Sequence, residues 1–549
     1  MPAVHTCPQC SSLVNCSPPA INPIQPPSPA TESLINTNDP PLDTFRVLID
    51  NRTQAQTRLD FVNNEIARME ENIRVLSAER DLLGGFVATY KRVLHPIRRL
   101  PDDVLREIFW ISLDHQNPDK EVYSGARQQN GEHDSLSPNK MPWKLGQVSR
   151  RWREVALSYP SLWSFVGIEF PDSYSMRGQS TGMGAQLFRQ LRRSGTSMLS
   201  VHLRSTHDCD LQAFSLLLAA ICSHSSRWQT LRVDLEIEQL HNLGALIGGE
   251  IPNLRRLYLE RRISPAQLAT IGMFSAAPKL HDITLPITNR LERLSVPWSQ
   301  ITHLRSMGSD GPFNRSFIRN SPHLISLFIR ASTFDPTPAE VTLPSLRLLA
   351  IQVGGHGAST ISDRLLRQIN SSRLQDLRIF ASNLQSSQLV IPSRLGQSLR
   401  SFCLGTRSLC TQDWTTVFKS MPGLEYLSLC EFLKDNPSWK DVLSDLGSRD
   451  PSSGRLQLLP RLRDIGLYAY KNFSLDGPSL LRLLETRFDQ YDPDSDASTS
   501  ANELQLQKVQ IHPNVRLPKN VLQQLEVMAS RGLQIDTSPK DWTDFFPGF

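Results

Sequence analysis

The sequence has no long hydrophobic run, few cysteines and little net charge. No stretch of the 549 residues approaches the roughly eighteen apolar residues that a membrane helix requires, and the longest candidate is the short segment 214–222. A basic segment followed by an apolar one is absent from the N-terminus, so we expect no membrane partner and a cytoplasmic or nuclear chain. Eight cysteines are too dispersed for a disulfide framework. A net charge of +5 permits acidic partners without requiring them.

Motifs for catalysis and nucleic-acid binding are also scarce. Residues 178–182 match the Gly-x-Ser-x-Gly nucleophile motif around Ser180, but that motif needs a strand before it and a helix after it, and a polar loop is expected here. A Gly-Lys-Ser/Thr phosphate loop and a His-Glu-x-x-His zinc motif are both missing. Short basic clusters at 98–99 and 150–153 are explained by helix flanks. We therefore expect no catalytic activity, no cofactor and no nucleic-acid partner.

Residues 1–42 are expected to form a disordered tail, because prolines crowd this segment and few large apolar residues are available to bury. Cysteine and histidine at four of its positions have the residue types of a zinc site: His5, Cys7, Cys10 and Cys16. A stable site usually takes a second ligand pair from a distant segment, which this sequence does not obviously offer. We expect a flexible tail without a metal.

Residues 43–96 have the pattern of one long helix with an apolar seam. Apolar residues recur every three or four positions, interrupted by Arg80: Leu59, Val62, Ile66, Met69, Ile73, Leu76, Leu83, Val87, Tyr90 and Leu94. Gly84 and Gly85 should weaken the helix, and Pro96 should end it. The pattern predicts either a coiled-coil homodimer or a single helix that folds back on its neighbours.

Two shorter segments between residues 97 and 165 are also predicted to be amphipathic helices. In the first, Pro101 suits the first helical turn, and the acidic pair at 102–103 complements the helix dipole. An apolar stripe follows, formed by Val104, Leu105, Ile108 and Phe109. In the second segment, Val148, Trp152 and Val155 are spaced by four and three, and arginines cover the flanks.

Together these segments, from Leu100 to Trp163, resemble an F-box. The sequence departs from that family in having Ser149 where many members carry cysteine, and in a polar insertion at 115–142 that is predicted to be a loop. The resemblance implies that a Skp-type adaptor, and through it a cullin, is bound by Leu100, Pro101, Val104, Leu105, Ile108, Phe109, Val148, Trp152 and Trp163. The alternative is that these helices belong to a larger helical core.

An irregular repeat, apolar-x-x-apolar-x-apolar, recurs through residues 187–535. The clearest copies are Leu254-Leu257-Leu259, Leu280-Ile283-Leu285, Leu324-Leu327-Ile329, Leu346-Leu349-Ile351, Leu374-Leu377-Ile379, Leu424-Leu427-Leu429 and Leu462-Ile465-Leu467. Weaker copies begin at residues 198, 228, 301, 399 and 506, and starts from 198 to 424 are 21 to 30 residues apart. This resembles leucine-rich repeats, whose period is roughly 20 to 29 residues. The asparagine that usually follows the strand is lacking, and 536–549 is expected to be a tail.

Stacked strands would place the residues between the apolar positions on one shared concave surface. These residues include Arg204, Arg232, Arg256, Tyr258, Phe328, Arg330, Arg378, Phe380, Tyr426 and Tyr468. Arginine and aromatic residues dominate binding hot spots, and arginine pairs with carboxylate or phosphate. We take Arg232, Arg256, Tyr258, Phe328, Arg330, Arg378 and Phe380 as candidates for binding an acidic or phosphorylated protein substrate. The alternative is ordinary solvated strand faces.

The predicted fold class is α plus α/β: an N-terminal coiled-coil helix, a helical F-box and a C-terminal solenoid of irregular leucine-rich repeats with parallel strands. The resemblance implies a non-catalytic substrate adaptor of a Skp-cullin-F-box ubiquitin ligase. The alternative is an interaction scaffold that is oligomerised by its coiled coil, with the F-box-like helices acting only as a cap for the first repeats.

Overall fold

A computed structural model describes residues 5–6, 13–14, 42–113, 134–170, 180–205, 211–261, 265–286, 293–307, 312–313, 316–331, 333–334, 340–353, 365–381, 389–406, 414–431, 439–452, 454–469, 473–489 and 505–537. The chain divides into two compact units, residues 1–101 and 102–549. Cys7, Cys10 and Cys16 lie outside the described residues, as do most of the insertion and of both predicted tails. Within the N-terminal tail, the short strands β1 (His5–Thr6) and β2 (Leu13–Val14) pair antiparallel.

The first unit is dominated by one helix of 52 residues, α2 (Leu42–Val93). The helix continues through Gly84 and Gly85, where the sequence predicts a weakness, and it ends one residue before Leu94. Pro96 begins a 3-10 helix, η2 (Pro96–Arg99), and the His95 ring nitrogen accepts a hydrogen bond from its backbone. Among the described residues, no helix combines the length and the apolar character needed to cross a membrane.

The second unit begins with the F-box-like helices: α3 (Asp102–Ser112), α5 (Leu145–Val148), α6 (Arg150–Leu157) and the 3-10 helix η4 (Pro160–Trp163). Ser149 caps α6, because its hydroxyl accepts a hydrogen bond of 3.2 Å from the backbone N–H of Trp152. The serine that departs from the family pattern therefore starts this helix. Arg151 reaches back to Asp102 at 2.7 Å and joins α6 to the first turn of α3.

A parallel sheet of fourteen strands follows, and each strand pairs with the previous and the next in chain order. The strands are β3 (Phe165–Phe170), β4 (Leu199–Ser205), β5 (Trp228–Asp234), β6 (Arg256–Leu259), β7 (Asp282–Leu285), β8 (His303–Ser306), β10 (Ser326–Ala331), β13 (Leu348–Val353), β15 (Asp376–Ala381), β16 (Ser401–Thr406), β17 (Tyr426–Glu431), β18 (Asp464–Ala469), β20 (Lys508–Ile511) and β22 (Gln534–Asp536). Each of the twelve predicted copies contributes one strand, and β3 and β22 extend the sheet at its two edges. The sheet thus begins before residue 187, where the sequence places the start of the solenoid.

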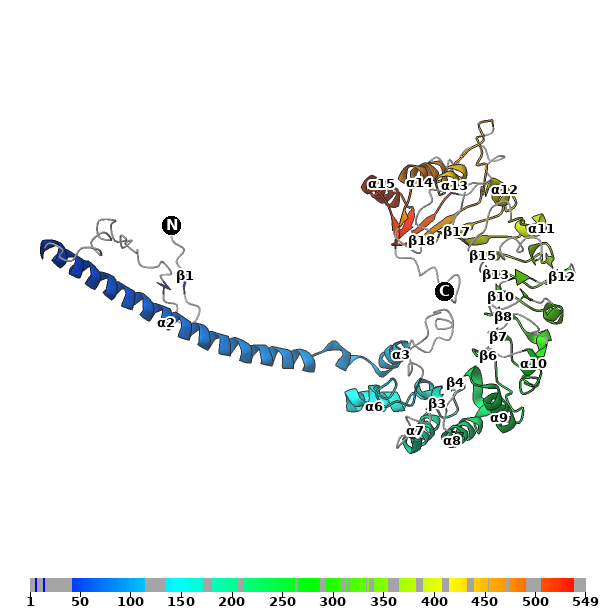
Figure 1. Cartoon of the computed structure of the whole chain (residues 1–549), viewed down its shortest axis with the longest axis horizontal. Helices are drawn as coiled ribbons and strands as arrows, with labels where there is room; N and C mark the ends of the chain where they lie inside the picture. The colour runs from blue at the N-terminus through cyan, green and yellow to red at the C-terminus, as the bar shows by residue number, and fades with distance from the viewer. Residues whose placement is uncertain are drawn as a thin grey trace. The chain divides into compact units, whose positions relative to one another are not determined.

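Most connections between these strands contain helices: α7 (Ser180–Arg193), α8 (Leu211–Cys222), α9 (Ile237–Ile247), α10 (Pro265–Leu268), α11 (Ser393–Gly396), α12 (Trp414–Lys419), α13 (Trp439–Leu446), α14 (Gly477–Leu484) and α15 (Lys519–Ser530). The short middle repeats have 3-10 turns such as η7 (Trp298–Gln300) and η8 (Ser316–Asn320) instead. The second unit curves with its helices outside and its strands inside (Figure 1). This is the layered arrangement of a parallel-strand solenoid, consistent with leucine-rich repeats.

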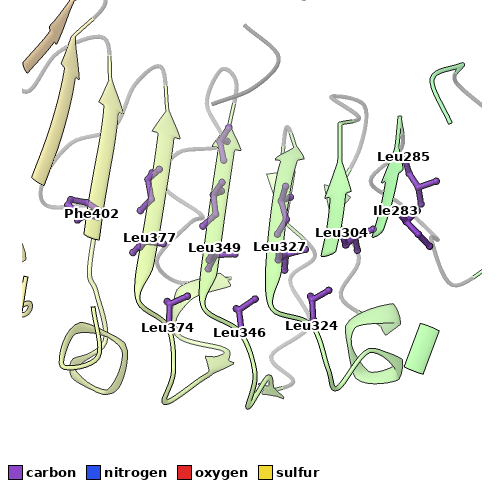
Figure 2. Packing of buried hydrophobic residues seen from close by; sticks show 14 of the residues in the cluster. Ile283, Leu285, Leu304, Leu324, Leu327, Leu346, Leu349, Leu374, Leu377 and Phe402 are labelled. Carbon is purple, nitrogen blue, oxygen red and sulfur yellow. The ribbon is translucent and has the colours of Figure 1, made fainter. Parts of the chain in front are cut away.

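The core of the solenoid consists of the three apolar positions of each repeat stacked in rows. In-register pairing places Leu327, Leu349 and Leu377 side by side, and all three are fully buried (Figure 2). The first leucines of the same repeats, such as Leu346, form a second row below the strands. Where a proline stands two residues before such a leucine, as Pro344 does before Leu346, it lies in the turn that leads into the strand, and a hydrogen bond from Leu346 N to Leu343 O closes this turn.

Three further pairs of two-residue strands lie outside the main sheet. They are β9 (Pro312–Phe313) with β11 (Thr333–Phe334), β12 (Val341–Thr342) with β14 (Ile369–Asn370), and β19 (Phe473–Ser474) with β21 (Val515–Arg516). Each pair is parallel and joins neighbouring turns of the solenoid, so the repeats are connected by backbone hydrogen bonds beyond the main sheet as well.

Candidate interaction surfaces

The residues predicted to bind an adaptor divide into internal and exposed groups. Leu105 and Phe109 are fully buried and Trp163 is nearly so, whereas the sequence places all three on the adaptor-binding surface. Phe109 instead packs on Trp152, with ring centres 4.8 Å apart, and so holds α3 against α6. Trp152 itself is half-buried. Leu100 and Pro101 belong to the first unit, where Leu100 is half-buried and Pro101 is exposed.

The exposed group forms an apolar stripe along α3. Val104, Ile108 and Ile111 are spaced by four and three residues, and 39%, 37% and 61% of their surfaces are exposed. This spacing places them on one face of the helix. Val148 at the end of α5 is also largely exposed. Ile111 is missing from the prediction, although its spacing from Ile108 points to it.

A second set of contacts joins the F-box-like helices to the first repeat. The Arg193 guanidinium of α7 lies 4.6 Å from the ring centre of Trp143 and 4.4 Å from that of Trp163. The end of the predicted insertion also takes part, because Leu136 lies in the solenoid core and the Ser135 hydroxyl accepts a hydrogen bond of 3.0 Å from Gly167 N of β3. The helices are therefore built into the end of the solenoid.

The face of the sheet opposite the core, here called the strand face, carries the predicted substrate-binding residues in continuous rows. Arg232 lies beside Tyr258 on the next strand. The same row continues through Thr284 and Arg305 to Phe328, Ala350 and Arg378. A second row runs Arg330, Gln352, Phe380. The register thus brings together residues that are about 20 or more positions apart in the sequence, as the repeat pattern predicts.

Acidic residues accompany the arginines at the N-terminal end of the strand face. Arg232 forms an ion pair with Glu260 of the following repeat. Asp234 lies 3.5 Å from Arg204 and 3.0 Å from Arg261, and Arg261 also pairs with Glu236. Three arginines thus meet three carboxylates, so the charges of these six side chains cancel in this part of the face.

Arginines also contact carboxylates further along the sheet, although one carboxylate there serves two arginines. Asp282 is buried between two arginines, 4.0 Å from Arg256 and 3.4 Å from Arg305. Arg378 binds Asp376 of its own strand at 2.7 Å, and this pairing raises the pKa of Arg378 although burial acts against it. An acidic or phosphorylated ligand would have to compete with carboxylates that are already in place.

The aromatic residues of the strand face are mostly buried. Tyr258 is 1% exposed and Phe328 is 4% exposed. Phe380 and Tyr468 form an apolar cluster with Cys403 and Cys430 that is separate from the main core. These side chains pack against one another, so the described surface offers fewer aromatic contacts than the sequence predicts.

Glycine at position 466 makes room for this cluster. A Cβ there would lie 2.7 Å from the Tyr468 ring and 3.4 Å from the Tyr426 hydroxyl. The hydroxyls of Tyr468 and Tyr426 both donate to the Gln510 side-chain oxygen, at 3.1 and 3.4 Å. Burial raises the pKa of Tyr426 to about 12 and that of Cys403 to about 12. These groups are therefore protonated at neutral pH, and none of them has the depressed pKa of an activated nucleophile.

The other described residues offer little support for a metal site or for a catalytic nucleophile. No group of three or more histidine, cysteine or acidic side chains among them is arranged to hold a metal ion. Helix α7 begins at Ser180, so a helix does follow the Gly-x-Ser-x-Gly motif where the sequence predicts a loop. The preceding strand β3 ends at Phe170, ten residues earlier, which is not the sharp strand-to-helix turn of a nucleophile elbow.

Comparisons with known proteins leave the family open. No protein-family model matches the sequence, and no curated protein matches it. Among solved structures, the chain is similar to an internalin (InlF) from Listeria monocytogenes, with 14% sequence identity and a TM-score of 0.27 over 69% of this chain and 93% of that chain. The parallel pairing of the strands, and not this likeness, identifies the solenoid.

Proposed function

We propose that this protein is a non-catalytic substrate adaptor of a Skp-cullin-F-box ubiquitin ligase. The observation that carries the proposal is the exposed apolar stripe of Val104, Ile108 and Ile111 on α3, in the segment that resembles an F-box. An apolar stripe on a short helix is the type of surface that docks into a partner's groove. Buried Leu105 and Phe109 support the proposal indirectly, because they fix the helix so that the stripe faces outward.

In this proposal the solenoid captures the substrate and other subunits perform the ubiquitin transfer. The contribution of the chain is proximity, because holding a substrate beside a ubiquitin-carrying enzyme raises the effective concentration of the two. The contacts of Arg193, Ser135 and Leu136 tie the F-box-like helices to the first repeat, which keeps the strand face at a fixed position relative to the docking stripe.

The ion pairs of the strand face also narrow the class of substrate. Arg232 and Arg378 are each paired with a carboxylate, so a purely acidic segment would gain little from them. We propose a protein segment that carries both signs of charge and that matches the alternating arginines and carboxylates. Electrostatic matching of this kind contributes mainly to specificity and to the rate of association.

The test uses the full chain and a purified Skp-type adaptor in isothermal titration calorimetry. The full chain is used because a fragment ending at residue 170 would lack Arg193, which contacts Trp163. Leu105 is not substituted, because an aspartate at this fully buried position would unfold the helices and so could not test the contact. Val104→Asp and Ile108→Asp change exposed side chains instead. Each should weaken binding at least tenfold, or about 1.4 kcal/mol, because an uncompensated charge would enter the apolar contact.

The matched control is Leu246→Asp on α9, because Leu246 is an exposed apolar residue of the solenoid with 47% of its surface accessible. It should bind the adaptor like wild type. Absence of binding by a folded wild-type chain would refute the proposal, and equal losses in the stripe variants and the control would show that the stripe is not the contact.

The second candidate function is an interaction scaffold in which the F-box-like helices serve only as a cap. It is favoured by the insertion of Leu136 into the solenoid core and by the hydrogen bonds between Ser135 and Gly167, since terminal repeats need a cap. The calorimetry separates the two functions, because a cap requires Leu136 and Trp163 but has no need of an exposed stripe on α3.

A further inference from the structure

The apolar seam of α2 is longer than the sequence pattern alone indicates. With Leu59 as position a of a heptad, the register extends back through Phe45 at a and Leu48 at d and continues to Tyr90 at d, all within one unbroken helix. Seven heptads fit this register. The seam residues from Leu59 to Tyr90, apart from Arg80, are between 38% and 64% exposed, so the described chain leaves them without a covering layer.

Residue types along the seam are those of a two-stranded parallel coiled coil. β-Branched residues occupy several a positions, namely Ile66, Ile73 and Val87. Leucine occupies d positions 48, 76 and 83. This combination favours two parallel strands over three or four, because side chains pack with different geometry at the a and d layers of a dimer.

The partner helix must be as long as α2 and must carry the same repeat. Among the other helices of the described residues the longest is α7 with 14 residues, which could cover only two heptads. A second copy of α2 meets both requirements. We propose that α2 is one strand of a parallel, in-register, two-stranded coiled coil with a second copy of this chain.

The charged residues of α2 are compatible with this arrangement. The ion pair of Glu71 with Arg74, at 2.6 Å, lies at outer positions f and b, away from the seam. Arg80 is paired with Asp81 of its own helix at 2.8 Å, and this exposed pair has to exchange for the contact across the seam. Arg80 occupies an a position, and in a parallel pair it reaches Glu79 of the partner subunit at position g. A polar residue at an a position costs stability but fixes the register, and Arg52 at another a position adds to this effect.

One charge pair opposes the parallel arrangement. Glu65 at g would face Glu70 of the partner subunit at e, which is a repulsion between like charges at the solvated rim. Glu65 is already paired with Arg68 of its own helix at 2.9 Å, which reduces the repulsion. The apolar layers of the seam outweigh one exposed repulsion of this kind, because surface charge pairs contribute little in water.

The first test is the mass of the full chain in solution, measured by sedimentation equilibrium or by light scattering after size exclusion. We expect twice the chain mass of 61.9 kDa. Ile66→Glu combined with Ile73→Glu should return the mass to that of one chain, because two charges would enter each strand of the seam. A wild-type monomer at tens of micromolar, or a trimer, would overturn the proposal.

The chain offers a close control for these seam variants. Phe61 and Val75 lie at c positions of the same helix with 46% and 50% exposure, so Phe61→Glu with Val75→Glu makes the same chemical change outside the seam. These variants should remain dimeric. If the seam variant remains dimeric, or if the seam variant and the control variant both become monomeric, the dimer contact does not lie at the seam. Circular dichroism of each variant checks that the chain is still folded.

The orientation is tested by charge reversal at the Arg80 layer. Glu79→Arg should raise the dimer dissociation constant several-fold in a parallel pair, and Glu79→Arg with Arg80→Glu should restore it. In an antiparallel pair the two positions lie far apart, so failure of the double variant to restore affinity would overturn the parallel arrangement. The inference does not depend on the proposed function, since dimerisation needs no adaptor and adaptor binding needs no dimer.

Discussion

Removal of the Arg193 side chain should loosen the junction between the F-box-like helices and the first repeat. The guanidinium lies 4.6 Å and 4.4 Å from the ring centres of Trp143 and Trp163. A cation above an aromatic ring contributes about 0.5–1 kcal/mol when exposed and about 2 kcal/mol when desolvated. Arg193 is half-buried, so we take about 1 kcal/mol per ring and expect Arg193→Ala to lower the free energy of unfolding by about 2 kcal/mol.

A double-mutant cycle with Trp143→Ala isolates the cation–π contribution. Trp143→Ala alone also removes the hydrogen bond of 2.9 Å from its indole to Ser135 O, and the cycle cancels that loss. We expect a coupling energy of about 1 kcal/mol from urea unfolding of the four proteins. Hydrogen exchange should localise the effect, with faster exchange of the β3 amides in Arg193→Ala.

The control for this prediction is Arg189→Ala, one turn earlier on α7, where the guanidinium bonds only to Gln186 among the described contacts at 3.1 Å. It should change the free energy of unfolding by less than about 0.5 kcal/mol, as is usual for surface substitutions. The prediction is refuted if Arg193→Ala and Arg189→Ala lower the free energy of unfolding equally, or if the coupling energy is within error of zero. In either case the contact of Arg193 with the two tryptophans does not stabilise the junction between the F-box-like helices and the first repeat.

Three further predictions concern the solenoid itself. Gly396→Ala should destabilise it by about 3 kcal/mol or more, because the new Cβ would lie 1.9 Å from the backbone oxygen of Ser420. Arg487→Met should cost about 3–5 kcal/mol, because the buried guanidinium donates to three main-chain carbonyls that would lose their partners. Stability should fall by a few kcal/mol between about pH 9 and pH 12, because burial raises the pKa of Cys403 and Tyr426 to about 12 and the unfolded chain loses these protons first.

Each of these predictions has a matched control in urea unfolding. Gly272→Ala meets no atom within 4 Å and should be nearly neutral, so equal effects at the two glycines would contradict the steric argument. Arg487→Lys keeps the charge but not the three-donor geometry and should fall between wild type and Arg487→Met. The combined variant Cys403→Ser with Tyr426→Phe removes both ionisations and should reduce the loss of stability above pH 9, while Cys222 and Tyr468, whose pKa values burial also raises, keep their share of it. If the pH dependence of stability in this variant equals that of wild type, the loss of stability does not come from Cys403 and Tyr426.

The solenoid is the part of the fold that the sequence predicts best, because each repeat contributes the same local signal. Twelve copies each become one strand, and even weak copies such as those beginning at residues 198 and 506 pair in register. The two edge strands, β3 and β22, are not predicted from the sequence, and there is a physical reason for each. Phe165–Phe170 follows directly on the F-box-like segment, and Gln534–Asp536 is a three-residue strand too short to carry the full pattern.

The faces of α3 could not be assigned from sequence. Val104 and Leu105 are adjacent apolar residues, as are Ile108 and Phe109, so the stripe is wide enough to serve two surfaces at once. Only the position of α6 decides which side is internal: the pairing of Phe109 with Trp152 buries 105 and 109 and leaves 104 and 108 outside. Periodicity identifies the helix, but tertiary packing assigns its faces.

The pairing of arginines with carboxylates on the strand face has a similar origin, and it bears directly on the choice of ligand. Arg232 and Glu260 are 28 residues apart, and their pairing follows from the register of β5 and β6, which no local pattern specifies. Counting arginines along single strands therefore overestimates the positive charge of the face. If the proposed adaptor role holds, specificity must come from matching the alternating charges rather than from general attraction of acidic chains. Substrate capture should then weaken when Glu260 is replaced by glutamine as well as when Arg232 is replaced, whereas a simple phosphate-binding surface would bind more tightly after loss of the competing carboxylate.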